Sequence, residues 1–274
     1  MANYDFRQLQ LHLLRMLLDF HELCRRHELH YYILFGTMLG AVRHRGFIPW
    51  DDDIDVGLPR EEYDLLLSHA ADWFPAPYEF ICYETDPRFL FGFGKMQDSS
   101  TTVIERKHIH YVGGVYIDIF PLDGISANPL LQRIHYLRYS YFKKVAYFLQ
   151  RDPYKHGHGP SSWVPLLTRR LYTPAAAMRG FNRVMRAYPY ARSSHVSALN
   201  DGLTSIMPKS TLGTPTPVEF EGHTVMGVEH PDAYLRHEFG DYMRLPPPQE
   251  RKSHNFYYLD LHTPYRRAHI DPDL

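Results

Sequence analysis

The chain has 274 residues, of which 44% are hydrophobic and 15% aromatic, enough to bury a full core and to exclude a mainly disordered protein. Its 30 Lys and Arg residues against 31 Asp and Glu residues give a formal net charge of -1, which excludes a uniformly basic nucleic-acid binder. The balance is uneven, because residues 129–200 hold 12 basic residues and one acidic residue, Asp152. The chain is therefore an acidic body with one basic segment.

The cysteine content and the hydropathy of the chain indicate the cellular compartment of the protein. Cys24 and Cys82 lie within apolar patterns, so we expect a reducing compartment and no disulfide framework. The N-terminal residues lack a basic stretch followed by an apolar core, and no apolar run reaches the roughly 18 residues that a spanning helix needs. We expect a cytoplasmic protein.

The first half of the chain alternates between helical and strand patterns. Apolar residues at three- and four-residue spacing predict a helix over 5–27. The elements predicted next are a strand at 31–35, a tight strand-to-helix passage at 37–42, a strand at 53–56, a helix from Pro59 to Trp73, and strands at 78–83, 91–96, 101–105 and 115–120.

The second half begins with a mainly helical pattern over 129–190, interrupted by a loop rich in Gly, Pro and Ser at 156–162. A hairpin over 218–228 turns at Gly222, and a helix over 231–239 ends at Gly240. This order predicts an α+β fold, a mixed sheet with flanking helices. Its expected parts are a core over 1–128, a mainly helical basic insertion over 129–215, and a segment over 216–274 that returns to the core.

Carboxylates carry the clearest chemical signal. Four of the five residues in Asp51-Asp52-Asp53-Ile54-Asp55 are acidic, and such charges repel one another unless water or a cation neutralises them. Within a strand, Asp53 and Asp55 project from one face. Asp118 interrupts a β-branched run, and a buried ionised carboxylate there needs a partner. The alternatives are a solvated acidic turn and a buried Asp that accepts backbone hydrogen bonds.

Neighbouring strands would bring Asp53, Asp55 and Asp118 to one face, where they could hold one or two Mg²⁺ ions, or Mn²⁺ as a substitute, for displacement at phosphorus. Gly36 and Thr37 lie between a predicted strand and a predicted helix, where amides and a hydroxyl can contact phosphate. Strand, Gly-Thr, helix, Asp-x-Asp and a later lone Asp follow the order of the nucleotidyltransferase-like fold.

Taken in one piece, residues 36–55 (GTMLGAVRHRGFIPWDDDID) resemble the LicD family of phosphocholine transferases, which is related to fukutin-type proteins. The similarity continues at 114–124 (GVYIDIFPLDG) and again at 234–254, which ends with Arg251 and His254. It spans roughly residues 30 to 255 in family order, and no motif matches within 129–210.

The resemblance implies transfer of phosphocholine from CDP-choline, or of another phosphoalcohol from its CDP derivative. The acceptor is a hydroxyl of a cell-surface glycan, such as lipopolysaccharide or teichoic acid, or of its lipid-linked precursor, and CMP leaves. By matching position, Asp53 and Asp55 hold Mg²⁺ at the diphosphate, and Asp118 is the third metal ligand or the general base. Gly36 and Thr37 contact phosphate oxygens.

Arg43 and Lys95 are the cationic candidates for the leaving phosphate, with a surface ion pair as the alternative for each. His254 is a candidate because its position matches the family. A quaternary ammonium binds to aromatic faces, and the candidates near the motifs are Trp50, Tyr83, Tyr111, Tyr116 and Tyr242. The histidine pairs at 108–110 and 156–158 lack a third ligand and are not interpreted as a zinc site.

The basic segment has three interpretations: a solvated helical face, a contact with an anionic acceptor or with the anionic membrane surface beneath it, and a single-stranded nucleic-acid site. We favour the second and disfavour nucleic acid. For the whole chain two other functions stay open. One is a nucleotidyltransferase that moves a nucleoside monophosphate to a small hydroxylated compound or RNA, and the other is a non-enzymatic cation-binding scaffold.

Overall fold

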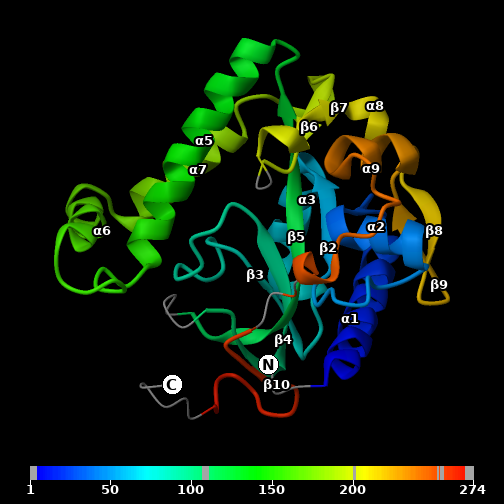
Figure 1. The fold of residues 1–274 in the computed structure, drawn as a ribbon, viewed down its shortest axis with the longest axis horizontal. Coiled ribbons are helices and arrows are strands. Elements are labelled where there is room, and N and C mark those ends of the chain that lie inside the picture. The colour runs from blue at the N-terminus through cyan, green and yellow to red at the C-terminus, as the bar shows by residue number, and fades with distance from the viewer. Residues whose placement is uncertain (1–4, 107–110, 200–201, 252, 254–255, 269–274) are drawn as a thin grey trace.

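A single mixed sheet forms the centre of the molecule (Figure 1). The computed structural model describes residues 5–106, 111–199, 202–251, 253 and 256–268. The main path of the sheet runs β1-β2-β5-β4-β10, and β2 and β5 pair in parallel while β4 runs antiparallel to β5. The strands on this path are β1 (Tyr32–Ile33), β2 (Asp55–Pro59), β4 (Gly94–Ile104), β5 (Gly113–Ile125) and β10 (Tyr258–Asp260). The predicted α+β class is confirmed.

One face of the sheet is covered by α1 (Phe6–Arg26) and α3 (Arg60–Ser68). The side chains of His12 in α1 and Arg60 in α3 bond to Asp98 of β4 and Asp123 of β5, and Ile117 and Ile119 are fully buried on this face. The helix predicted over 5–27 is confirmed, and Asp5 caps its first turn by accepting from the amides of Arg7 and Gln8. The helix predicted from Pro59 to Trp73 breaks at His69 into α3 and α4 (Ala70–Trp73).

Two predicted strands are one continuous strand. The sequence predicts separate strands at 91–96 and 101–105, but β4 begins at Gly94 and continues to Ile104, with a register irregularity between Asp98 and Val103. Where the ladder is interrupted, the hydroxyl of Thr101 accepts from the amide of Val115 at 2.7 Å. A Cβ on Gly114 would lie 1.9 Å from the carbonyl oxygen of Asp98, so this close approach requires glycine. β3 (Tyr78–Ile81) pairs with β4 on its other side.

Three helices that each begin with proline form an arm beside the sheet: α5 (Pro129–Gln150), α6 (Pro160–Leu171) and α7 (Pro174–Met185). The helical pattern predicted over 129–190 is confirmed, but the interruption lies at 151–159, and residues 160–162 of the predicted loop form the first turn of α6. A second hydrophobic cluster joins α5 and α7 to the end of β5 through Tyr139, Phe181 and Ile125. Two strands within 129–215 were not anticipated: β6 (His195–Ser197) pairs with β5, and β7 (Met207–Pro208) pairs with β6.

The hairpin and the helix predicted near the C-terminus are confirmed, whereas β10 was not anticipated. β8 (Thr216–Phe220) and β9 (His223–Gly227) form a hairpin whose turn residues Glu221 and Gly222 both have positive φ, and α9 (Pro231–Phe239) ends at Gly240. The remaining short elements are α2 (Phe35–His44), α8 (Lys209–Leu212) and the 3₁₀ turns η1 (Tyr190–Arg192), η2 (Leu203–Ser205) and η3 (Pro248–Glu250). The division into three parts stays a prediction, and among the described residues no helix has the length and apolar character to cross a membrane.

The bond between α1 and β4 gives the fold an acid-sensitive contact. Asp98 is fully buried, and burial alone would raise its pKa, but hydrogen bonds from His12 and Ser100 outweigh burial and lower the pKa below its usual value. A carboxyl with a lowered folded-state pKa stabilises the protein above the unfolded-state pKa of about 3.9, and this contribution is lost as the pH falls through the folded-state value.

We therefore expect Asp98→Asn to cost about 1–3 kcal/mol of unfolding free energy at neutral pH, and less below about pH 4, in urea titrations across the acid range. Asp72→Asn, at an exposed position in α4, is the control and should follow the wild-type curve. A loss of equal size at neutral pH and at pH 3 would show that the pKa of Asp98 is not lowered.

Candidate functional site

Two carboxylates meet where β2 and β5 run side by side. The parallel register pairs Asp55 with Asp118, and adjacent strands lie about 4.8 Å apart. Both aspartates are half-buried, whereas Val56 and Ile119, the residues that follow them, are fully buried on the opposite face. The pairing continues one residue further, because the amide of Asp118 donates to the carbonyl of Ile54 at 2.9 Å. The predicted juxtaposition of Asp55 and Asp118 is confirmed.

The predicted strand begins at Asp53, but β2 begins two residues later, at Asp55. Asp53 therefore lies outside the strand. Asp51 and Asp52 precede it in a loop, as expected, and the side chain of Gln10 in α1 holds that loop by donating to the carbonyl of Asp51 at 3.0 Å. Asp53 nevertheless lies near enough for its charge to act on Tyr116, which neighbours Asp118 on β5. Burial raises the pKa of Tyr116 well above its usual value, and the charges of Glu105, Asp118 and Asp53 raise it further.

Thr37 fixes the start of β2. The helix α2 begins at Phe35, so Gly36 and Thr37 lie in its first turn, and the predicted passage from strand to helix at 37–42 is wrong. The hydroxyl of Thr37 accepts the amide hydrogen of Asp55 at 2.9 Å. A Cβ on Gly36 would lie 2.8 Å from a carboxylate oxygen of Asp51. Both residues therefore shape the acidic loop, and their contact with phosphate stays a prediction.

Lys95 provides a buried cation beside Asp118. In the register of β4 and β5 these two residues are directly paired. The Lys95 ammonium lies 3.5 Å from Asp118 Oδ1, 2.5 Å from Glu105 Oε1 and 3.1 Å from the centre of the Tyr116 ring. The alternative of a surface ion pair fits Lys95 only in part, because Lys95 is buried while the side chain of its partner Glu105 is 37% exposed. Sequence reasoning missed Glu105, whose only local signal is its place at the end of a predicted strand.

Two further cations, Arg43 and Arg251, lie near the end of α2. Arg43 donates to the carbonyl of Tyr242 at 2.8 Å, and its pKa is lowered by burial and by the nearby charge of Arg251. Arg251 stacks over Trp50, with 4.8 Å between the guanidinium carbon and the ring centre. Trp50 directly precedes the acidic loop, so these cations border it. His254 lies outside the described residues.

The five aromatic candidates are distributed over different places. Tyr111 and Tyr116 line one pocket together with Lys95 and Glu105. Tyr83 packs against the second hydrophobic cluster, Tyr242 donates to Asp232 of α9 at 3.0 Å, and Trp50 lies under Arg251. The described structure thus places two of the five aromatic candidates in the pocket beside Lys95 and Glu105.

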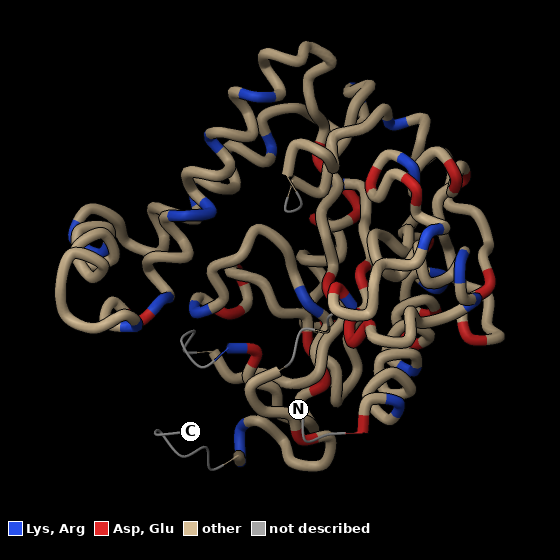
Figure 2. Tube along the Cα trace, in the orientation of Figure 1, with Lys and Arg blue, Asp and Glu red and all other residues tan. Residues whose placement is uncertain are grey.

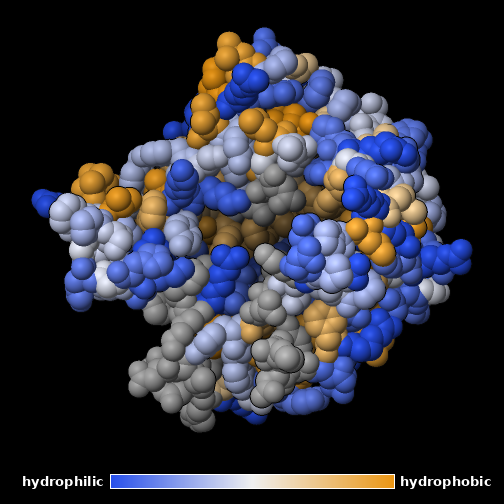
Figure 3. Space-filling model, in the orientation of Figure 1, coloured by the Kyte–Doolittle hydropathy of each residue, from blue (hydrophilic) through white to orange (hydrophobic). Residues whose placement is uncertain are grey.

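A larger cavity of about 360 Å³ adjoins this pocket and shares Phe91, Glu105 and Arg106 with it. Its other wall is the inner side of α5, with Tyr139 and Lys143. Figure 3 shows the surface hollowed between the helical arm and the sheet. The hollow therefore runs from the pocket of Lys95, Glu105 and Tyr116 to the inner side of α5.

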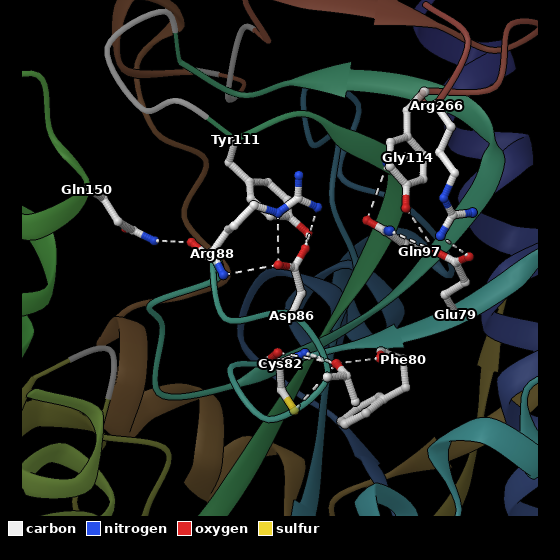
Figure 4. A network of polar contacts seen from close by, with 12 residues as sticks. Glu79, Phe80, Cys82, Asp86, Arg88, Gln97, Tyr111, Gly114, Gln150 and Arg266 are labelled. Carbon is white, nitrogen blue, oxygen red and sulfur yellow. Dashed lines mark hydrogen bonds and ion pairs between the residues drawn. The ribbon is translucent and has the colours of Figure 1, made fainter. Parts of the chain in front are cut away.

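Polar contacts hold the walls of this hollow (Figure 4). Gln150 at the end of α5 donates to the carbonyl of Arg88 at 3.1 Å, Arg88 bonds to Asp86 at 2.7 Å, and the hydroxyl of Tyr111 donates to the same carboxylate. On the neighbouring strands, the side chain of Gln97 accepts from Gly114 and donates to Glu79. These contacts fix the helical arm and the pocket wall relative to the sheet.

The carboxylates of Asp55 and Asp118 supply part of the oxygen ligands that a Mg²⁺ ion needs. Among the described residues no three His, Cys, Asp or Glu side chains are grouped so that they could hold a metal ion by themselves. Mg²⁺ is commonly held by one or two carboxylates together with substrate phosphates and water, and Asp55 and Asp118 supply such a pair. The residues present therefore fit a Mg²⁺ ion that is bound together with a diphosphate, and this ligand set stays a prediction.

Comparison with known proteins agrees with the order of these motifs. A family described as LicD/FKTN/FKRP, nucleotidyltransferase domain, matches residues 28–175. The lipopolysaccharide cholinephosphotransferase LicD of Haemophilus influenzae is 30% identical over 271 residues, covering 93% of this chain and 97% of the relative. An uncharacterised protein of Rickettsia prowazekii is 48% identical over 52 residues, which are 19% of this chain and 20% of that protein. The chain belongs to the LicD family.

Proposed function

We propose that this protein transfers phosphocholine from CDP-choline to a hydroxyl of a cell-surface glycan or its lipid-linked precursor and releases CMP. The relative that aligns with nearly the whole chain is by name a lipopolysaccharide cholinephosphotransferase. The observation that carries the proposal is the register pair of Asp55 and Asp118 beside the buried ammonium of Lys95. Carboxylates and a cation on one face suit a reaction in which negative charge moves between phosphate groups.

In the proposed reaction the acceptor oxygen forms a bond to the phosphorus that carries choline, and the bond from that phosphorus to the oxygen of CMP breaks. The hydroxyl proton passes to Asp118, which is half-buried and placed beside Asp55. Mg²⁺ bound by Asp55 and Asp118, with Asp53 nearby, would neutralise the charge of the diphosphate. We assign the phosphate of the departing CMP to Arg43, whose neighbour Arg251 adds a second positive charge.

We infer that Lys95 orients Asp118 and does not bind the leaving phosphate. Its ammonium is already held by Glu105, Asp118 and the face of Tyr116, so it keeps the carboxylate of Asp118 oriented on the sheet face. A phosphate could attract Lys95 only in exchange for Glu105. We therefore assign Lys95 to positioning Asp118 and leave the leaving phosphate to Arg43.

The identity of the product tests the proposal. Incubation with CDP-choline, Mg²⁺ and lipopolysaccharide that lacks phosphocholine should release CMP and add the mass of phosphocholine to the acceptor. EDTA should stop CMP release, and added Mg²⁺ or Mn²⁺ should restore it. Parallel reactions with CDP-ethanolamine and CDP-ribitol define the alcohol.

Two other outcomes have distinct meanings. A nucleotide attached to the acceptor would replace the proposal with nucleotidyl transfer, which the description of the matched family also accommodates. CMP release that continues unchanged in EDTA would overturn the Mg²⁺ assignment while leaving phosphocholine transfer in place.

A further inference from the structure

The outer side of α5 carries an exposed apolar stripe. Leu130, Ile134, Leu137 and Tyr141 recur at spacings of four, three and four residues, so they lie on one face of the helix. Each is largely solvent-exposed, and Leu137 has 68% of its surface accessible. The opposite side of α5, with Tyr139, is buried against the core. A helix that is already packed on one side thus exposes a second apolar face.

A similar face lies on α6. Ser162 and Pro165 are buried on its inner side, and Arg169 donates to the carbonyls of Leu149 and Arg151 at the end of α5. Four large apolar residues on α6 remain mostly exposed, with Trp163 at 66% and Leu171 at 67%. These four residues are Trp163, Val164, Leu167 and Leu171.

A hydrogen bond connects the two faces. Tyr141, the last residue of the α5 stripe, shares a hydrogen bond of 2.5 Å between hydroxyl groups with Tyr172, which follows Leu171. We name the combined face the α5–α6 surface, and it consists of Leu130, Ile134, Leu137, Tyr141, Trp163, Val164, Leu167 and Leu171. In Figure 3 orange patches mark the arm at both ends. Large exposed apolar areas of this kind on a folded domain mark interaction sites.

Positive charge borders this surface. Arg133, Arg138 and Lys144 flank the stripe on α5, and Arg170 lies beside Leu171 on α6. The sequences of α5, α6 and α7 contain no Asp or Glu, and Figure 2 shows the arm carrying blue segments almost alone. Apolar side chains with a basic border match the interface of a membrane that contains anionic lipids. A second copy of the chain would instead bring the same cations together, which disfavours self-association.

We propose that the α5–α6 surface docks on an anionic lipid membrane, with Leu137, Trp163 and Leu167 entering the interface and the basic residues contacting lipid headgroups. The inner side of α5 lines the cavity that adjoins the pocket of Lys95, Glu105 and Tyr116. One helix thus separates the lipid surface from the proposed acceptor cavity. Only this last orientation rests on the proposed function, since docking itself requires no turnover.

Vesicle flotation with the full chain tests the docking, in the absence of donor and acceptor. The protein should float with vesicles of phosphatidylcholine mixed with phosphatidylglycerol, and added salt should weaken this binding. Arg133→Gln combined with Arg138→Gln should lower the affinity about fivefold for each Arg removed. Leu137→Gln combined with Leu167→Gln should lower it at least about tenfold.

The matched control is Leu11→Gln combined with Arg26→Gln, at exposed positions on α1, and it should bind like wild type. Circular dichroism verifies that each variant folds. Equal flotation with pure phosphatidylcholine, or full binding by both test variants, would overturn the proposal. So would wild-type dimers in size-exclusion chromatography that the Leu variant converts to monomers without any vesicle binding. CMP release with a soluble acceptor is measured separately, so a failure of docking and a failure of the proposed reaction give different results.

Discussion

Asp118→Asn is expected to lower kcat for CMP release by about a thousandfold or more while the protein stays folded. The substitution keeps the shape of the side chain but removes the negative charge of residue 118, which lies opposite Asp55 in the parallel register. Loss of a general base alone lowers rates by about 10²–10⁴-fold, and loss of a metal ligand adds to this. The thermal midpoint without Mg²⁺ should stay near the wild-type value, because the lost repulsion between neighbouring carboxylates offsets the lost ion pair with Lys95, which keeps its contact with Glu105.

The control for this experiment is Asp72→Asn, an exposed carboxylate in α4, which should keep wild-type turnover. Steady-state CMP release and thermal melting are measured on the same preparations. An unfolded Asp118→Asn protein would support a structural role for the acidic cluster, as a cation-binding scaffold requires. A folded variant with near wild-type turnover would remove Asp118 from the reaction.

Arg60→Met is expected to destabilise the protein by about 3–5 kcal/mol. Arg60 in α3 donates two hydrogen bonds to Asp123 of β5, at 2.7 and 2.6 Å, and both side chains are buried. Burial alone would lower the pKa of Arg60, but the charge and hydrogen bonds of Asp123 raise it. Removal of the guanidinium leaves the Asp123 carboxylate buried without its partner, which is the costly state.

Urea unfolding compares this variant with two others. Arg236→Met breaks an exposed pair with Asp232 in α9 and should change stability by no more than about 1 kcal/mol. Replacing Arg60 and Asp123 together by Met and Leu should restore most of the loss, because no isolated charge remains. Equal effects of Arg60→Met and Arg236→Met would contradict the assignment of a large stability role to the buried pair.

The elements that the sequence predicts well are those with local signals. The helix at the N-terminus has its cap at Asp5, the hairpin has its turn at Gly222, and α9 ends at Gly240. Each signal depends on residues within a few positions of one another. The alternation of Asp53, Ile54 and Asp55 also predicts a strand, but the structure begins it at Asp55, where the amide bonds to Thr37, 18 residues earlier.

The site was predictable where carboxylates interrupt apolar strands and unpredictable where its partners come from distant segments. Asp118 stands out because an ionised group is unusual between Ile117 and Ile119. Glu105 reaches Lys95 only because β4 continues through its irregularity, and Arg251 reaches Trp50 only because the C-terminal segment returns across the molecule. No local pattern encodes either contact.

The length of β5 sets a fixed distance in this enzyme. The strand runs without a break from Asp118 to Ile125, about 23 Å at 3.3 Å per residue, and α5 begins soon after at Pro129. If α5 rests on lipid as proposed, its packing against the end of β5 holds Asp118, the proposed base, at a fixed position relative to the bilayer. The position of a hydroxyl along a lipid-anchored glycan then becomes a criterion for modification, in addition to the chemistry of the sugar itself.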